Sequence, residues 1–258
     1  VTRHPGPYGP AKEGRDMSIV RSTLIVACAA LFVLSASIAD AQNRPPQAGG
    51  ASDCQRALAD RFDSLDVNTL DQDTVDAIVL LREEEKLARD VYLTLSWWYD
   101  LPIFPNIAKS EQQHMNLVAM LLDRYGIPDP AAGNGIGVFT DPWVQDLFDD
   151  LVASGAQSVV DALFAGAKIE DVDIYHLKHI LDHSDFDDVN LIVQNMVAGS
   201  RNHMRGFVGA LVRRDETYTA EFISQAELDA ILASPMETGV IYDENGDVLA
   251  ECGRASTR

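Results

Sequence analysis

Four long amphipathic segments, each with carboxylates or imidazoles among its apolar residues, constrain the fold of this chain more than any other feature. The segments run from about Asp71 to Trp98, from Asn106 to Gly126, from Ser158 to His183 and from Asp187 to Arg213. Their apolar residues recur at alternating three- and four-residue spacing, as Ile78, Leu81 and Ala88 do, which is the period of a helix with one buried face. The sequence therefore predicts four long helices.

The connections between these helices predict how they are wired. The first two are joined across Pro102 and Pro105 and the last two across residues 184–187, so both links are short. Between the pairs, Ile127 to Gln157 is long, rich in Gly and Pro at its start, and holds one short helical segment near Pro142 to Ala153. Short link, long crossover and short link is the order found in ferritin-like bundles. We therefore expect an all-α fold, a ferritin-like four-helix bundle over residues 71–213.

Residues 214–258 predict a small helix followed by a β-hairpin. Ser224 and Glu227 form a capping box before the helix. Two apolar runs then flank the turn Asn245-Gly246, which is typical of a hairpin. Cys54 and Cys252 stand near opposite ends of the chain that follows residue 41, and in an oxidising compartment we expect them to form one disulfide.

The first 70 residues predict export. Residues 1–16 have no apolar period and are expected to be an untranslated upstream segment. Residues 17–41 have a short basic start, an apolar run and the sequence Ala39-Asp40-Ala41, which are typical of a signal peptide cleaved near Ala41. A lipoprotein box ending at Cys28 is the alternative, but only about five apolar residues precede it. Residues 42–70 are expected to be a leader and N-terminal segment of a periplasmic or secreted protein.

The balance of charge excludes some functions. The chain carries 40 acidic and 20 basic residues, a net charge of −20. So acidic a surface repels nucleic acid. No apolar run reaches the roughly 18 to 20 residues that a membrane-spanning helix needs. We therefore expect neither a nucleic-acid partner nor a membrane span.

Polar residues within the apolar stripes identify a candidate metal site. A buried carboxylate is costly unless something pairs with it, so its recurrence on several helices needs a physical reason. The six candidate ligands are Glu85, Glu111, His114, Glu170, Asp173 and His203, with Glu84 as an alternative to Glu85. Taken singly, a Glu-x-x-His pair is more often a surface pair, and a lone histidine is more often a core residue. Agreement across four helices favours metal binding.

The types and spacing of these residues suit two divalent ions. Glu111 and His114 are three residues apart, so their Cβ atoms lie about 5 to 6 Å apart on one helix face and both can reach one ion. Two divalent cations would cancel the charges of the four carboxylates while the imidazoles stay neutral. Oxygen and nitrogen ligands without thiolate favour iron or manganese, and zinc less specifically.

Two other features are weaker candidates. His176, His179 and His183 form a second stripe that could bind a surface metal, but a solvated helix face is the simpler interpretation. The run Trp97-Trp98-Tyr99 is expected to close one end of the bundle.

Several motifs resemble known families. Glu85-Lys-Leu-Ala88-Arg89-Asp-Val-Tyr92 resembles the first metal-binding helix of rubrerythrins, and Ser110-Glu111-Gln-Gln-His114 resembles their second. The runs REEEKLARDVYLTL, LPIFPNIAKSEQQHM, LLDRYGIPDP and GSRNHMRGF are more closely similar to the prokaryotic ferritin-like family known as domain of unknown function 2202. That likeness covers about Asp71 to Leu232.

The resemblance implies a role for each candidate ligand. By position, these are Glu85 from the first helix, Glu111 as a bridge with His114 beside it, Glu170 or Asp173 from the third helix, and His203 from the fourth. Rubrerythrins carry Glu-x-x-His on the last helix, whereas Ser200 and His203 stand here. The second bridging carboxylate is therefore missing, and either Asp173 or Glu84 replaces it or the second ion is weak or absent. The rubredoxin-type iron, which needs four cysteines, is also absent from the sequence.

The expected function is that of an exported ferritin-like metal-binding protein, a di-iron or di-manganese carboxylate oxidoreductase acting on peroxide, oxygen or ferrous iron. One alternative is a bundle that binds or stores a metal or ligand without turnover. A purely structural module that holds no metal is the other. Expected partners are metal ions, an external electron donor for a redox-active centre, and a second copy of the chain in a homodimer.

Overall fold

The computed structural model describes residues 51–252, which are predominantly helical, as predicted. They form α1 (Ala51–Ser64), α2 (Gln72–Trp98), α3 (Ile103–Tyr125), α4 (Pro142–Gly155), α5 (Val159–His183), α6 (Asp187–Val212), α7 (Gln225–Ala233), β1 (Val240–Tyr242) and β2 (Val248–Glu251). The predicted upstream segment, signal peptide and start of the leader, residues 1–50, lie outside the described residues. None of the helices from residue 51 to residue 252 is long and apolar enough to cross a bilayer.

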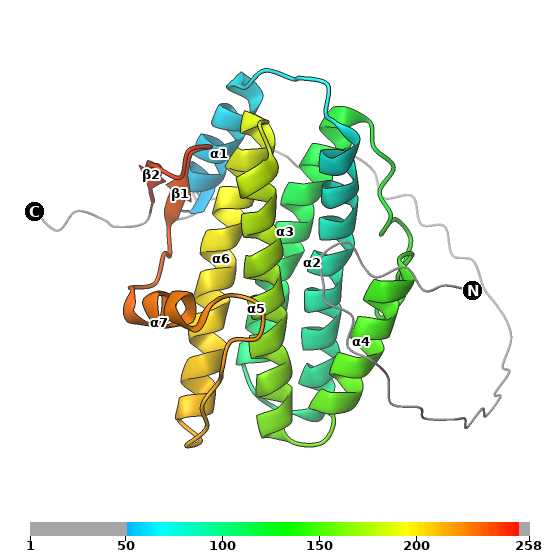
Figure 1. Cartoon of the computed structure of the whole chain (residues 1–258), viewed down its shortest axis with the longest axis vertical. Helices are drawn as coiled ribbons and strands as arrows, with labels where there is room; N and C mark the ends of the chain where they lie inside the picture. The colour runs from blue at the N-terminus through cyan, green and yellow to red at the C-terminus, as the bar shows by residue number, and fades with distance from the viewer. Residues whose placement is uncertain (1–50, 253–258) are drawn as a thin grey trace, which may run out of the picture. The chain divides into compact units, whose positions relative to one another are not determined.

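The four long helices α2, α3, α5 and α6 lie side by side and enclose a common interior (Figure 1). α2 packs on α3 and α5, and α6 packs on the same two helices. Local signals set their ends, because the side chains of Asp71 and Ser158 cap α2 and α5, and Gly126 ends α3 in the left-handed conformation. α3 begins at Ile103, a turn earlier than predicted. Pro105 is tolerated in the first turn, because N–H groups there make no hydrogen bond within the helix and the missing N–H of proline costs nothing.

The apolar interior divides into two clusters along the four long helices. One cluster holds Val91 and Leu95 of α2 together with Phe104 of α3 and Phe207 of α6. The other is formed by earlier residues of α2 and α6 and by later residues of α3 and α5. On α2, α3 and α6 the predicted metal ligands fall between the residues of the two clusters, whereas on α5 Glu170 and Asp173 stand between Ile169 and Ile174 of the first cluster.

The crossover between α3 and α5 is fixed to the outer face of α2. Four residues of α2, here called the crossover clamp, are Arg82, Glu83, Lys86 and Asp90. Lys86 Nζ donates to Gly135 O at 2.7 Å, and Glu83 accepts backbone N–H bonds from Thr140 and Asp141 at 2.6 and 2.7 Å. α4 then continues the crossover and packs on α2 and α5.

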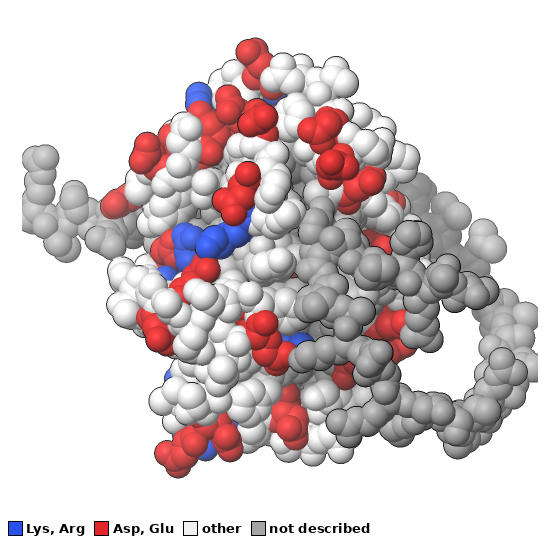
Figure 2. Space-filling view, in the orientation of Figure 1, with Lys and Arg blue, Asp and Glu red and all other residues white. Residues whose placement is uncertain are grey.

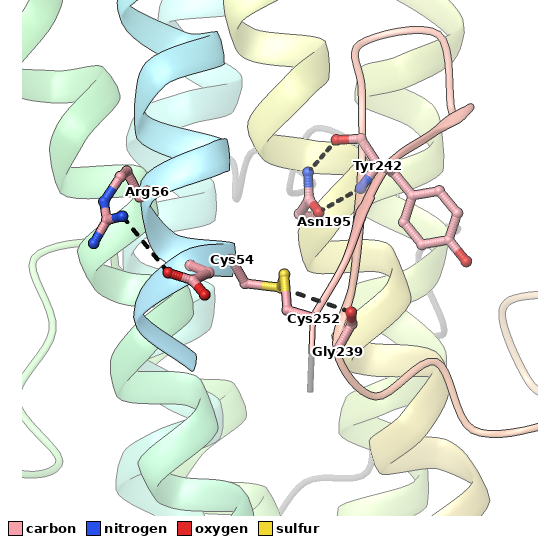
Figure 3. Close-up of a disulfide and its surroundings, with 7 residues drawn as sticks. Cys54, Arg56, Asn195, Gly239, Tyr242 and Cys252 are labelled. Atoms are coloured by element: carbon pink, nitrogen blue, oxygen red, sulfur yellow. Dashed lines mark hydrogen bonds and ion pairs between the residues drawn. A yellow bond between two sulfur atoms is a disulfide. The ribbon is translucent and has the colours of Figure 1, made fainter. Parts of the chain in front are cut away.

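α1 and the hairpin are joined by the predicted disulfide between Cys54 and Cys252, whose Cα atoms are 5.6 Å apart (Figure 3). Asn195 of α6 holds the hairpin, because its side chain bonds both the N–H and the carbonyl of Tyr242. No helix was predicted over residues 53–70, so α1 is an addition to the predicted fold. Leu58 and Phe62 anchor α1 in the second apolar cluster.

The surface is acidic, as expected, but two tryptophans that were predicted to close one end of the bundle are exposed on it. Acidic side chains are spread over the face shown in Figure 2, and basic ones gather mainly in one short band. Trp97 is 68 % exposed and Trp98 49 %, so neither indole closes the end of the interior. Only Tyr99 turns inward, where its hydroxyl donates to Gly155 O.

Candidate metal centre

Five of the predicted ligands form two groups that share one residue. Glu85, Glu111 and His114 make the first group, and Glu111, Glu170 and His203 make the second. Within each group the potential ligand atoms, one per residue, lie within 4.8 Å of one another. All five side chains are buried, and all four long helices contribute.

Glu111 lies between two imidazoles. Its Oε2 is 2.9 Å from His114 Nδ1, and its Oε1 is 2.8 Å from His203 Nδ1. The same nitrogen of each imidazole also lies near a second carboxylate, Glu85 at 3.2 Å from His114 Nδ1 and Glu170 at 3.4 Å from His203 Nδ1. The arrangement is therefore nearly symmetric about the Glu111 carboxylate.

Neighbouring residues orient two of these side chains. Gly199 of α6 leaves room for the ring of His114, since a Cβ at this position would lie 2.4 Å from His114 Nε2. The ring is thus held with Nδ1 toward the centre. Tyr92 donates its hydroxyl proton to Glu170 Oε1 at 2.5 Å and keeps that carboxylate in place. Sequence analysis missed both roles, and a glycine within a helical pattern was the available signal for Gly199.

Several buried atoms of the centre lack hydrogen-bond partners among the described residues. These are Glu85 Oε1, Glu111 Oε1 and His203 Nδ1. The contact between Glu111 and His203 is short but lacks hydrogen-bond geometry. Because buried polar atoms are normally satisfied, such a group of unmatched donor atoms fits a cation better than it fits a closed polar network.

In the metal-free protein, protons supply part of the missing positive charge. Burial raises the pKa of Glu85, and it raises that of Glu170 to about 7. Burial would also raise the pKa of Glu111, but the charged forms of His203 and His114 hold it below its usual range. Burial opposes protonation of His203, yet the charges of Glu111 and Glu170 raise its pKa to about 10. The buried carboxylates thus repel one another, and divalent cations would neutralise their negative charge.

The remaining predicted ligands lie outside the two groups. Asp173 is next to the centre, and its Oδ2 accepts a hydrogen bond from Ser200 Oγ at 2.5 Å. Glu84 turns away from the centre, and its Oε1 lies 2.7 Å from His176 Nδ1. Glu84 therefore does not stand in for Glu85.

The second histidine stripe is not one solvated face. His176 is buried against Glu84, whereas His183 is exposed and bonds the carbonyl of His179. The ring of His176 is thus separated in environment from the rings of His179 and His183, whose centroids are 4.0 Å apart, and the helical period alone could not distinguish them.

The fold and the site define a helical protein with a buried cluster of carboxylates and imidazoles that could hold metal ions. The chain belongs to the family described as an uncharacterized protein domain (DUF2202), which matches residues 74–235.

A relative and a solved structure extend this match. Uncharacterized protein MJ0754 of Methanocaldococcus jannaschii is 43 % identical over 183 residues, which is 71 % of this chain and 99 % of that protein. The crystal structure of hypothetical protein MJ0754 from Methanococcus jannaschii DSM 2661 matches with a TM-score of 0.66 and 45 % identity, over 67 % of this chain and 99 % of that one.

Proposed function

We propose that this chain is an exported ferritin-like four-helix bundle that binds two metal ions, one at each group, with Glu111 between them. Glu85 and His114 would hold the first ion, and Glu170 and His203 the second. The observation that carries the proposal is the Glu111 carboxylate, which presents one oxygen to each imidazole. Asp173, held by Ser200, is the nearest replacement for the carboxylate that the fourth helix lacks.

Iron or manganese bound there would supply redox chemistry toward peroxide, oxygen or ferrous iron. The residues of the chain bind and position the ions, and Tyr92 holds Glu170 by its hydrogen bond. The two apolar clusters exclude water on either side of the centre. Electrons for turnover would come from a separate donor.

Metal analysis of the loaded protein tests the proposal. After loading with ferrous or manganous ion, native mass spectrometry is expected to find two ions per wild-type chain and at least one fewer in His114→Ala. His183→Ala is the matched control, because His183 is an exposed histidine outside the centre, and its metal content is expected to equal that of wild type. A folded wild-type protein that takes up no metal would refute the proposal.

Binding or storage without turnover is the second candidate. It is favoured by the burial of the five ligands, none of which is more than 7 % exposed, since this leaves little room for a substrate beside the ions. Peroxide consumption by the iron-loaded protein with an artificial electron donor separates the two. Oxidoreductase activity predicts turnover that disappears in His114→Ala, and storage predicts none.

A further inference from the structure

A carboxylate and an imidazole lie together in the seam between α2 and α5, just outside the metal centre. Glu84 precedes the ligand Glu85, and His176 is one turn beyond Asp173. Glu84 Oε1 and His176 Nδ1 are 2.7 Å apart, and the two side chains are 10 % and 8 % exposed. Glu84 Oε1 accepts no hydrogen bond from residues 53–252. The pair is thus nearly buried.

Carboxylates continue inward from this pair. Asp173, at 9 % exposure, is the most exposed of the six predicted ligands. It lies close enough to Glu85 and Glu170 for their charges to raise its pKa beyond the effect of burial. By position, Asp173, one turn before His176, and Glu85, directly after Glu84, are the next carboxylates for a cation held by this pair. Each step offers an oxygen ligand of the type that iron and manganese accept.

Two other seams beside the centre suit a cation less well. Between α2 and α3, Arg89 bonds Gln112 and Arg82 bonds the carbonyl of Met115, so two guanidinium groups, each also paired with a carboxylate, bridge that seam. Between α3 and α6, Gly199 and the ring of His114 are packed in direct contact. A fixed positive charge repels an incoming cation, and a tightly packed contact blocks it.

We infer that Glu84 and His176 form the entry point by which divalent metal ions reach the buried centre along the α2–α5 seam. The inference rests on the proposed metal-binding function. Glu84 captures the ion, and His176 supplies a second ligand, a ring nitrogen, while the ion sheds water. The ring of Trp143 of α4 lies beside this pair, with its centroid 6.3 Å from that of His176.

The test is the rate at which the metal-free protein takes up manganous ion, followed by loss of the free-ion EPR signal. Glu84→Gln keeps the shape of the side chain and removes its charge, and we expect uptake to slow by about tenfold, with the final metal content retained. Glu227→Gln is the control, since Glu227 pairs with Lys178 on the outer side of α5, and its uptake is expected to match that of wild type. His176→Gln should also slow uptake, and it provides the test if Glu84→Gln does not fold, as judged by circular dichroism.

A second measurement separates capture from ligation. Rising ionic strength should slow uptake in wild type and have less effect in Glu84→Gln. Salt screens the attraction between the incoming cation and the Glu84 carboxylate, and the variant lacks that carboxylate charge. Wild-type uptake rates in both variants would overturn the inference, as would a reduced final metal content, which would make Glu84 a ligand. A wild-type protein that takes up no manganese would defeat the proposed function itself, and the two failures are thus distinguishable.

Discussion

Two clusters of buried charge lie on opposite sides of α2, and they differ in how completely they are satisfied. In the crossover clamp, Lys86 is paired with Asp90, and both oxygens of Glu83 accept backbone N–H bonds. In the candidate metal centre, Glu85 is as deeply buried as Lys86, yet one of its oxygens has no partner among residues 53–252. Burial of charge alone thus does not identify a functional site. The unmatched ligand atoms do, because a closed network has nothing left to offer an ion.

The largest effect on stability is expected from removing one member of the Lys86–Asp90 pair in the crossover clamp. Asp90→Ala leaves the buried Lys86 ammonium without its counter-charge, and the free energy of unfolding should fall by about 3 to 5 kcal/mol. Denaturant unfolding measures the loss. Asp146→Ala, an exposed carboxylate on α4, should change stability by less than about 0.5 kcal/mol. A small loss of stability in Asp90→Ala would mean that the buried charges of the clamp are no better paired than those of the centre.

The disulfide should rank second, and its loss should leave the metal centre intact. Cys54→Ser opens a loop with a sequence separation of 198 residues, and the free energy of unfolding should fall by about 2 to 4 kcal/mol. The ion pair of Arg61 with Glu244 still holds α1 to the hairpin and limits the loss. Reduction of the wild-type protein should reproduce the effect in calorimetry. Loss of metal on reduction would contradict the separation of the two regions.

Gly199→Ala tests the centre through a residue that contacts the ligand His114 but is not itself a ligand. The new methyl group would overlap the ring of His114, which should cost about 1 to 3 kcal/mol and weaken metal binding by about tenfold. Gly209→Ala on the same helix meets only an ordinary contact with Arg213 and should stabilise by about 0.5 to 1 kcal/mol. Calorimetric metal titration and thermal unfolding measure the two effects. Equal outcomes in both variants would show that His114 is not held by its contact with Gly199.

The smallest effect concerns pH and the metal-free protein. The folded-state pKa of Glu170, about 7, is above its unfolded value, so the folded state binds more protons and stability falls as pH rises toward 7. Glu170→Gln should flatten this dependence and stabilise the metal-free protein by about 1 kcal/mol at pH 8, with little change at pH 4. Chemical unfolding at both values tests it. A variant less stable than wild type at pH 8 would indicate that Glu170 is already well compensated without metal.

Apolar periodicity and capping residues predicted the long helices because both signals are local. Asp71, Ser158 and Gly126 mark helix ends through bonds to their own neighbours. α1 escaped detection because it is largely polar and depends on distant partners. Its Phe62 ring lies under the guanidinium of Arg124, 62 residues away, and Cys54 bonds the far end of the chain.

The ligand groups could be predicted only in outline. Helical spacing places Glu84 and Glu85, or Glu170 and Asp173, near the same edge of the interior, and the rotation of the helix decides which one enters. That rotation depends on packing against other helices. The contacts of Asp173 with Ser200 and of Glu84 with His176 are therefore visible only in three dimensions.

The bond between Cys54 and Cys252 also has a mechanical consequence. It turns residues 54–252 into a covalent ring that contains every long helix and all the ligands of the proposed centre. A pull on the two ends of the chain is carried across the sulfur–sulfur bond and bypasses the helices. As long as that bond is oxidised, tension at the ends cannot draw the four helices apart, and ions bound at the proposed centre would be shielded from it.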